Sequence, residues 1–350
     1  MQTFFIVAIL ALGFLITFQI AKASEYVAVL RGEEKAKKQT NKVNAFLLLL
    51  FLIFGLIGVY YCNERLKGRI LGDPASDHGV LIDRMLYITI AVTFVVFVIT
   101  QVALFWFSYK YQQSDDRKAY YYPHNNKLEL IWTVIPAIVL TVLVGFGIFY
   151  WFKITGKPPR NAMQVEIVGS QFKWEFRYPG KDSILGKKYY KKITGDNPLG
   201  QIWEDPANHD DIYVSGDPMH LIVNRPVQLV IGAKDVIHDV GLAHFRMKMD
   251  AVPGTPTTMW FTPTKTTAQM IKETGKSDFV YEISCDQMCG SGHTRMRGEI
   301  IVESQEEFDV WMAQQTPKYF AVFPDKNPNK PKTDTTGAAT PAATTATGQQ

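Results

Sequence analysis

The sequence predicts a membrane-anchored all-β protein in which four transmembrane helices precede a β-sandwich. Three observations predict this fold class. Four long stretches without a charged residue all lie within the first 152 of the 350 residues. Short alternating runs typical of strands begin at Met163. No comparable apolar stretch follows residue 152, so the second half is expected to be a water-soluble domain.

The four uncharged stretches are residues 1–21, 43–63, 85–109 and 130–152. A helix of about 20 residues crosses the roughly 30 Å of hydrocarbon in a bilayer, and each stretch reaches that length. The first pair forms an amino-terminal unit over residues 1–63. The second pair forms a helix hairpin that we place at residues 64–152.

The first stretch has a second interpretation as a secretory signal peptide, because "AKAS" at residues 21–24 resembles a cleavage site. However, no Lys or Arg precedes the stretch, whereas residues 22–42 contain six. Basic connections stay in the cytoplasm, and residues 64–84 and 110–129 contain four Lys or Arg each. We therefore expect four retained helices, with both termini outside the cytoplasm.

Seven runs between residues 163 and 304 predict the strands of a sandwich or small barrel, separated by Pro-, Gly- and Asn-containing turns. They are "MQVEIVG", "QFKWEFRYPG", "MHLIVN", "PVQLVIGAK", "TTMWFTPT", "DFVYEIS" and "GEIIVES". We place this domain at residues 153–318. Within it, residues 180–218 show no strand alternation and are expected to be a long surface excursion that contacts a partner.

Two segments follow the last strand. "SQEEFDVWMAQQ" at residues 304–315 predicts a helix with Ser304 as its N-cap and Phe308, Trp311 and Met312 on one face. Residues 319–350 are rich in Thr, Ala and Pro toward their end, and we expect this tail to be disordered.

The segment "SCDQMCGSGHTRMRG" at residues 284–298 indicates a metal site. A zinc site prefers four Cys or His ligands, whereas this loop offers two cysteines, one histidine and the soft thioether of a methionine, which suits copper. A single blue copper ion needs one cysteine and two histidines. Two thiolates can instead bridge two copper ions. The third cysteine, Cys62, ends an apolar stretch and is interpreted as structural.

A two-copper site needs a second histidine from another strand. His238 in "KDVIHDVGL" follows a predicted apolar strand and is the candidate, while His244 competes for the role. A bridged pair of copper ions suits electron transfer, because one electron shared over two metals and two sulfurs changes the bond lengths little.

These segments resemble the cytochrome c oxidase subunit II family. "CDQMCGSGHTRM" matches the family's binuclear copper A signature, Cys-x-x-x-Cys-x-x-x-His-x-x-Met. "KDVIHDVGLAHFRMKMDAVPG" is similar to the segment with the first histidine ligand, and "HNNKLELIWTVIPAIVL" looks like the start of the second core membrane helix. The resemblance covers about residues 85–315 and implies a cupredoxin-like β-sandwich.

The resemblance also implies a ligand set, with imidazoles from His238 and His293, bridging thiolates from Cys285 and Cys289, the thioether of Met296 and the backbone carbonyl of Gln287. Gln287 departs from the family, which usually has a Glu that also binds magnesium at the contact with subunit I. A neutral amide is a weaker magnesium ligand than a carboxylate, so the magnesium site is in doubt.

Further roles follow from the same resemblance. Phe172 and Trp174 in "QFKWEF" match the aromatic pair through which electrons reach the copper site, and Phe172 replaces the usual tryptophan. Glu129 matches a carboxylate that feeds a proton channel of subunit I, and Asp250 matches a residue near that subunit. A lysine-rich cytochrome is expected to dock on carboxylates of "EDPANHDD", namely Glu204, Asp205, Asp210 and Asp211.

The resemblance therefore implies a subunit II of a bacterial haem-copper oxidase in the plasma membrane. Its expected partners are subunits I and III and a separate c-type cytochrome, since no Cys-x-x-Cys-His haem motif occurs. No nucleic-acid partner is expected. A quinol oxidase subunit would lack the copper ligands, a copper carrier would leave "KLELIWTVIP" unexplained, and nitrous oxide reductase would need a further large domain. The two added helices are expected to contact a neighbouring complex or an extra subunit.

Overall fold

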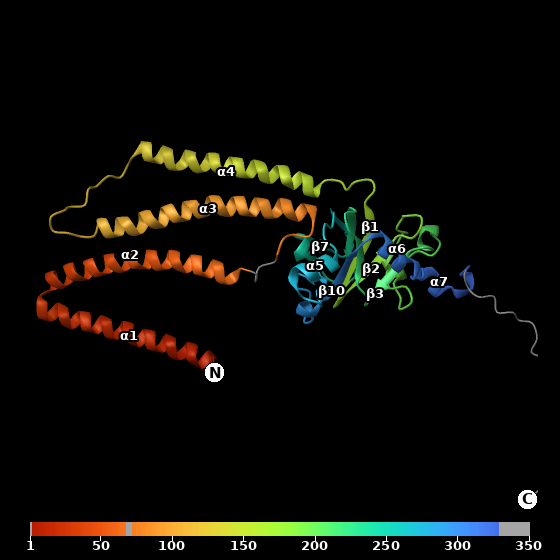
Figure 1. Ribbon diagram of the computed structural model, residues 1–350, viewed down its shortest axis with the longest axis horizontal. Helices are drawn as coiled ribbons and strands as arrows, with labels where there is room; N and C mark the ends of the chain where they lie inside the picture. Colours follow the sequence, from red (N-terminus) through yellow and green to blue (C-terminus); the bar gives the residue numbers. More distant parts are fainter. Residues whose placement is uncertain (1, 68–71, 329–350) are drawn as a thin grey trace, which may run out of the picture. The chain divides into compact units, whose positions relative to one another are not determined.

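The computed structural model describes residues 2–67 and 72–328, and the chain divides into two compact units (Figure 1). The first unit contains four long helices. The second contains the strands and is built from Ile154 onward together with the short segment Ala75–Gly79. The sequence placed that short segment in the helix hairpin. It belongs to the β domain because the Ser76 hydroxyl donates to the Phe245 carbonyl (2.7 Å) and Asp77 accepts from the Thr262 amide (2.9 Å).

The helices of the first unit are α1 (Gln2–Arg31), α2 (Glu33–Leu66), α3 (Asp77–Lys110) and α4 (Asn126–Thr155). All four contain a window long and apolar enough to cross a membrane. In α4 no side chain is buried, although most of them are apolar. Such exposure is expected of a surface that lipid or other subunits cover.

The charged connection expected at residues 22–42 is helical instead. Both flanking helices continue into it and only Gly32, with a positive φ of 84°, interrupts them. The segment is rich in Ala, Glu and Lys, which are strong helix formers. Glycine is the residue that adopts this backbone conformation at no steric cost, so the turn falls there.

The second unit is a sandwich of two five-stranded sheets. One has the order β3-β2-β1-β5-β8 and the other β4-β10-β9-β6-β7. The strands of the first sheet are β1 (Met163–Ser170), β2 (Lys173–Tyr178), β3 (Ile212–Ser215), β5 (Val227–Ala233) and β8 (Thr257–Phe261). Those of the second sheet are β4 (Met219–Ile222), β6 (His238–Leu242), β7 (Met247–Ala251), β9 (Tyr281–Cys285) and β10 (Arg297–Glu303).

The predicted β-sandwich and its seven strands are confirmed, while β3, β6 and β7 were missed. β6 has the sequence "HDVGL" and β7 has the sequence "MKMDA". Charged or small residues occupy positions that would have to be apolar for the alternation typical of a strand to be recognised. β6 is nevertheless buried along its whole length, because it lies between β7 and β9.

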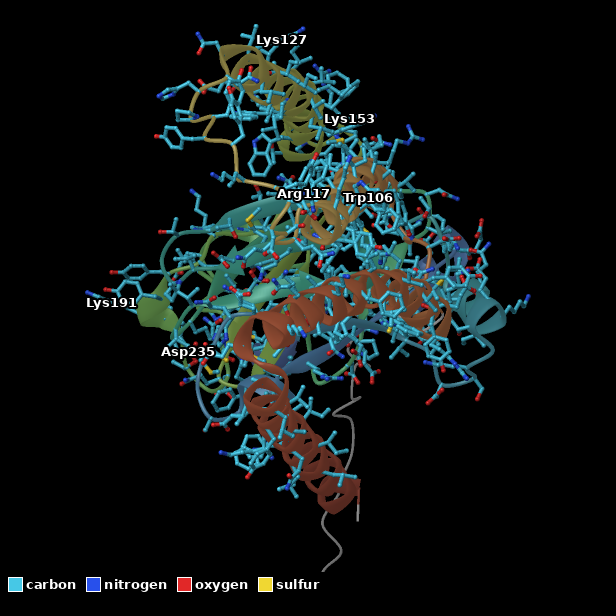
Figure 2. The ribbon with its side chains drawn as sticks, turned by 90° about the vertical axis from the view of Figure 1, so that its left-hand side faces the viewer. Trp106, Arg117, Lys127, Lys153, Lys191 and Asp235 are labelled. Carbon is cyan, nitrogen blue, oxygen red and sulfur yellow. The ribbon has the colours of Figure 1, made fainter. Side chains whose placement is uncertain are left out.

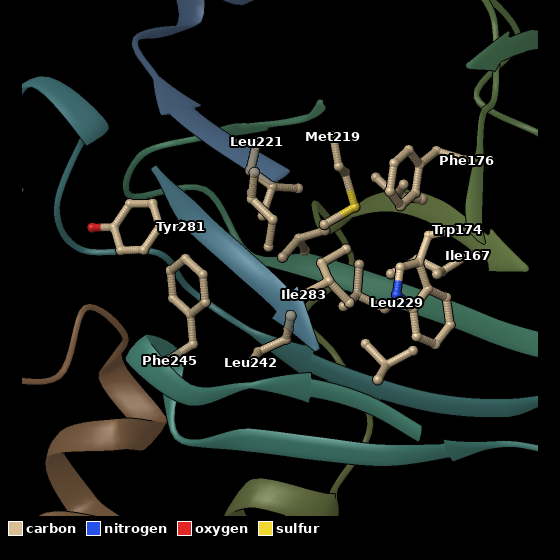
Figure 3. Close-up of a cluster of buried hydrophobic side chains, with 14 of the residues drawn as sticks. Ile167, Trp174, Phe176, Met219, Leu221, Leu229, Leu242, Phe245, Tyr281 and Ile283 are labelled. Atoms are coloured by element: carbon tan, nitrogen blue, oxygen red, sulfur yellow. The ribbon is translucent and has the colours of Figure 1, made fainter. Parts of the chain in front are cut away.

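The core fills the space between the two sheets (Figure 3). Ile167 and Leu229 of the first sheet and Leu221 and Ile283 of the second are all completely buried. Side chains of a strand alternate between its two faces, so each inward residue leaves its neighbours on the outer face of the sheet. On β1 and β2 three of these outer-face residues, Glu166, Glu175 and Arg177, are charged and yet buried.

The excursion at residues 180–211 covers that charged outer face, contrary to the expectation of a loop lying on the surface. Arg177 of β2 donates to Glu166 of β1 (2.6 Å), to Asp211 (2.8 Å) and to the Gly186 carbonyl (2.9 Å). All three charged side chains are at most 6% exposed. Burial raises the pKa of Asp211 to about 6 although the Arg177 charge opposes the shift. The excursion is thus fixed by a buried ionic network and ends directly in β3.

Helix α6 (Gln305–Ala313) confirms the predicted carboxy-terminal helix, and Ser304 accepts from the Glu307 amide as its N-cap. The disorder expected from residue 319 does not hold at its beginning. Helix α7 (Lys318–Val322) places Tyr319 in a stack on His209, with ring centroids 3.9 Å apart. Aromatic residues at the start of the tail supply the apolar surface that its Thr- and Ala-rich end lacks. Residues 329–350 lie outside the described part of the chain.

The Arg177 network gives a prediction for stability. Arg177→Ala leaves Asp211 buried without its counter-charge and leaves Glu166 with only the partly exposed Lys188, and it should lower the free energy of unfolding by roughly 3–5 kcal/mol. Lys192→Ala breaks the exposed pair with Glu204 and should cost less than about 1 kcal/mol. Urea unfolding of the full chain in detergent, followed by near-ultraviolet circular dichroism, measures both. Equal effects of the two substitutions would contradict the role given to the network.

Candidate metal centre

Two segments far apart in the sequence form the candidate metal centre. His238 opens β6, Cys285 ends β9, and the loop from Asp286 to Met296 joins β9 to β10. β6 and β9 are antiparallel neighbours, with Val240 opposite Cys285. This pairing brings His238 to the cysteine loop across 47 residues of sequence.

The six residues of the predicted ligand set meet in one cluster. The Sγ atoms of Cys285 and Cys289 are 3.7 Å apart. Cys285 Sγ lies 3.8 Å from His238 Nδ1, and Cys289 Sγ lies 3.8 Å from His293 Nδ1. Met296 Sδ is 3.9 Å from Cys289 Sγ, and the Gln287 carbonyl is 3.2 Å from Cys285 Sγ. Each cysteine is therefore flanked by one histidine. Cys285 also lies near the Gln287 carbonyl, and Cys289 near the Met296 thioether.

The cluster fits a soft metal. Donor atoms at about 2.3 Å from one tetrahedral ion lie roughly 3.8 Å apart, which is close to the separations found here. His238, Cys285, Cys289 and Met296 are buried, whereas His293 is only partly covered. Both cysteines are free thiols. Two thiols, two imidazoles and a thioether suit copper, and no carboxylate takes part as a hard ion would require.

Burial also affects the protonation of the thiols. It raises the pKa of Cys289 to about 11, and the neighbouring Cys285 adds to the shift. A metal ion binds the thiolate, so loading this site releases the proton that the Cys289 thiol otherwise holds at neutral pH.

Two residues that the sequence did not single out orient the ligands. Asp235 Oδ1 lies 2.8 Å from His238 Nε2, so the imidazole that donates from Nε2 presents the lone pair of Nδ1 to the thiols. Gln171 donates from its backbone to Asp235 Oδ2 (2.7 Å) and from its side chain to the Cys289 carbonyl (2.5 Å). Burial raises the pKa of Asp235, but these hydrogen bonds outweigh it and hold the pKa below the usual value. The sequence signal that could have identified Asp235 was its short spacing from His238.

The predicted aromatic pair lies against the cluster. Trp174 is buried and meets the His238 ring edge-on, with centroids 6.0 Å apart. Phe172 is partly exposed and covers the loop at Gly290 and Gly292. A Cβ at Gly292 would lie 2.5 Å from the Phe172 ring, so this position requires glycine. Phe172 thus contacts the loop on one side and is partly exposed to solvent on the other.

Other predicted residues lie elsewhere. Glu129 is in the first turn of α4, within the helical unit. Asp250 lies on β7 opposite Asp239 of β6. The docking role expected of Asp211 is wrong, because this residue is completely buried against Arg177. Glu204 pairs with Lys192, and Asp205 caps a short helix.

Two further histidines of the β domain, His220 and His244, lie against aromatic residues instead of the thiols. His220 Nδ1 lies 2.7 Å from Glu303 and its ring stacks on Trp311. His244, the competitor for the second ligand position, meets Phe279 and Tyr281 edge-on. Burial holds the pKa of His244 below the usual value.

Comparison with known proteins gives consistent matches. The family model "Cytochrome C oxidase subunit II, transmembrane domain" matches residues 74–149, and "Cytochrome C oxidase subunit II, periplasmic domain" matches residues 163–305. The alternative cytochrome c oxidase subunit 2 of Bradyrhizobium diazoefficiens is 31% identical over 254 residues, which cover 73% of this chain and 86% of that protein. Cytochrome c oxidase subunit 2 of Thermostichus vulcanus is 26% identical over 268 residues, covering 70% and 78%.

Among solved structures, the periplasmic domain of subunit II of cytochrome oxidase from Bradyrhizobium japonicum is similar. It is 20% identical, with a TM-score of 0.32, and the match covers 46% of this chain and 98% of that one.

The contact between Phe172 and the loop gives a second prediction. Gly292→Ala forces either the ring or the loop to move, and this overpacking should cost about 1–3 kcal/mol and weaken copper retention. Gly232→Ala on β5 is the matched control, since a Cβ there meets nothing within 4 Å. Copper content after dialysis against a chelator measures retention. Equal retention in both variants would show that the Phe172 contact does not hold the loop.

Proposed function

Because the chain belongs to the cytochrome c oxidase subunit II family, we propose that its β domain holds a binuclear copper A centre for electron uptake. It is a membrane-anchored subunit whose β domain lies on the periplasmic side. Electrons would come from a c-type cytochrome and pass to haem in subunit I, where oxygen reduction is coupled to proton pumping. The convergence of His238, Cys285, Cys289, His293 and Met296 in one cluster carries the proposal.

The ligand roles follow from the donor atoms. His238 and His293 would bind through Nδ1, the two cysteines would bridge, and Met296 Sδ and the Gln287 carbonyl would complete the set. When bound, a two-copper group of this kind takes up and releases one electron. The chain supplies the rest, because it excludes water from the thiols, fixes His238 through Asp235 and holds Cys289 through Gln171.

We assign electron uptake to Phe172 and Trp174. Phe172 is the partly exposed member and lies against the Gly290–Gly292 backbone between two ligands, whereas Trp174 lies behind it against His238. A donor bound over Phe172 would therefore be separated from the copper ligands by one aromatic ring and a loop backbone.

The contacts with other subunits concern Glu129 and Gln287. Glu129, in the first turn of α4, would deliver protons to a channel of subunit I, and subunit III would be a further neighbour. Gln287 has an exposed side chain, and its neutral amide supports only a weak magnesium site at the contact with subunit I.

Electron paramagnetic resonance of the copper-loaded oxidase tests the proposal. One electron shared by two copper ions gives a seven-line hyperfine pattern, and Cys285→Ser should abolish it because one bridge is lost. A four-line pattern of a single copper ion in the unmodified protein, or zinc without copper, would overturn the proposal. Cys62→Ser is the control, since Cys62 lies on α2 and should leave the spectrum unchanged.

A separate prediction tests Glu129. Glu129→Gln removes the titrating group but keeps its size, so proton uptake coupled to turnover should slow while reduction of the copper centre by the donor keeps its rate. Stopped-flow measurement of both steps in the intact oxidase separates them. Unchanged proton uptake would assign Glu129 only to stabilising the start of α4.

A further inference from the structure

A groove of about 960 Å³ opens at one end of the β domain, and the function described so far does not use it. We call it the basal groove. Its lining comes from the linker after α4, the start of β1, the end of β2, the start of the excursion, and the segment from α6 to α7. A cavity of this size can hold a small organic ligand.

The basal groove lies at the end of the β domain where the chain leaves the membrane. Ile154, near the carboxyl end of α4, packs against the core of the sandwich. The Gly156 carbonyl accepts from the indole of Trp260 on β8 (2.8 Å). Arg160 lines the groove and follows Thr155, the last residue of α4, by five positions, at most about 17 Å of extended chain. The groove is therefore within reach of lipid headgroups.

Arg225 is held at the same end of the sandwich by its two neighbours. The Asn224 amide donates to the Pro263 carbonyl (2.7 Å), and the Pro226 carbonyl accepts from the amide of Met163, the first residue of β1 (2.8 Å). Both hydrogen bonds join backbone groups, so the position of Arg225 is fixed by the fold.

Three basic side chains line the basal groove: Arg160, Lys181 and Arg225. Arg160 and Lys181 are exposed, and neither makes an ion pair with a residue that the structure describes. Arg225 is half-buried and donates to Gln305 Oε1 (3.3 Å), which uses one of the five N–H donors of its guanidinium. Arginine and lysine side chains of this kind bind phosphate oxygens.

Asp210 is the carboxylate in the lining of the groove. Its Oδ2 accepts from the Asp182 amide (3.1 Å), whereas its Oδ1 is buried and has no hydrogen-bond partner among the described residues. A buried carboxylate oxygen without a donor costs free energy, so a ligand that brings a donor is favoured here. A phosphate group cannot serve, because it repels the carboxylate. A primary ammonium group offers three N–H donors.

The other charged residues of these segments do not line the groove. Asp211, Glu307 and Asp309 accept hydrogen bonds from within the chain, and the exposed Asp182 accepts from the Ile184 amide. The remaining ones outside the lining are Lys157, Glu306, Lys318, Asp325 and Lys326. Both signs of charge are thus present around the groove. Its selectivity rests on the placement of three cations and one carboxylate in the lining, and not on a net charge of the region.

One wall of the basal groove is apolar. Phe308 and Met312 of α6 and Phe320 of α7 belong to the lining. A fitting ligand therefore combines a phosphate, an ammonium group and an apolar body.

We propose that the basal groove binds a phosphatidylethanolamine from the periplasmic leaflet. Its phosphate lies at Arg160, Lys181 and Arg225, its ammonium group at Asp210, and its glycerol and first methylenes against the apolar wall. The inference does not depend on the copper centre. It requires only that the β domain begins at the membrane surface.

Native mass spectrometry of the intact oxidase, delipidated in detergent and titrated with single lipids, tests the proposal. Phosphatidylethanolamine should bind about tenfold more tightly than phosphatidylglycerol, which lacks an ammonium group, or phosphatidylcholine, whose ammonium group has no N–H. Arg160→Gln combined with Lys181→Gln should weaken its binding about tenfold. Asp210→Asn should remove the preference for phosphatidylethanolamine. Lipids bound along the membrane helices are common to all variants, so the site is measured from the differences between them.

Lys187→Gln combined with Lys191→Gln is the matched control. Both lysines are exposed residues of the excursion outside the lining of the groove, and Lys191 lies at the edge of the β domain in Figure 2. An equal loss of binding in this control, or equal binding of the three lipids by the unmodified protein, would overturn the inference. So would displacement of the lipid by inorganic phosphate, which would indicate a site for free anions.

The carboxy-terminal tail is the competing occupant. Asn327 and Pro328 line the basal groove, and residues 329–350 continue from there. Deletion of residues 329–350 should leave the affinity for phosphatidylethanolamine unchanged. Binding that occurs only after this deletion would assign the groove to the tail and would contradict a lipid site.

Discussion

The pairing of β6 with β9 is the contact on which the candidate metal centre depends. Val240 lies opposite Cys285, and this register sets His238 beside the first cysteine. A shift by one residue would turn the histidine to the other face of the sheet. β6 is buried along its length and held by β7 on its other side, so the register is strongly specified. The sandwich thereby positions a ligand that the compact cysteine loop cannot supply itself.

Features that depend on residues close together in the sequence could be predicted, whereas features that depend on contacts between distant segments could not. The four helices and seven strands were predictable because their apolar patterns are local, and the ligand set because five of its six members lie in one loop with distinctive spacing. β6 could not be predicted, because it is buried by the strands on both sides of it and its own sequence shows no apolar alternation. Asp235 and Gln171 act through hydrogen bonds between segments, which single-sequence patterns do not reveal.

The environment of the acidic segment at residues 204–211 also depends on contacts between distant segments. From the sequence, "EDPANHDD" reads as a solvated negative segment, and only tertiary structure reveals that Arg177 draws Asp211 into the interior. One buried arginine therefore removes Asp211 from the charge that this segment presents to solvent.

Gly32 has a mechanical consequence for the amino-terminal helices. Because it alone separates α1 from α2, the charged residues on either side extend the two helices by about ten residues each, or roughly 15 Å. A flexible loop would act as a slack tether between two membrane segments, whereas this arrangement is a stiff two-stranded rod. A force or a bound protein at the tip would tilt both helices together.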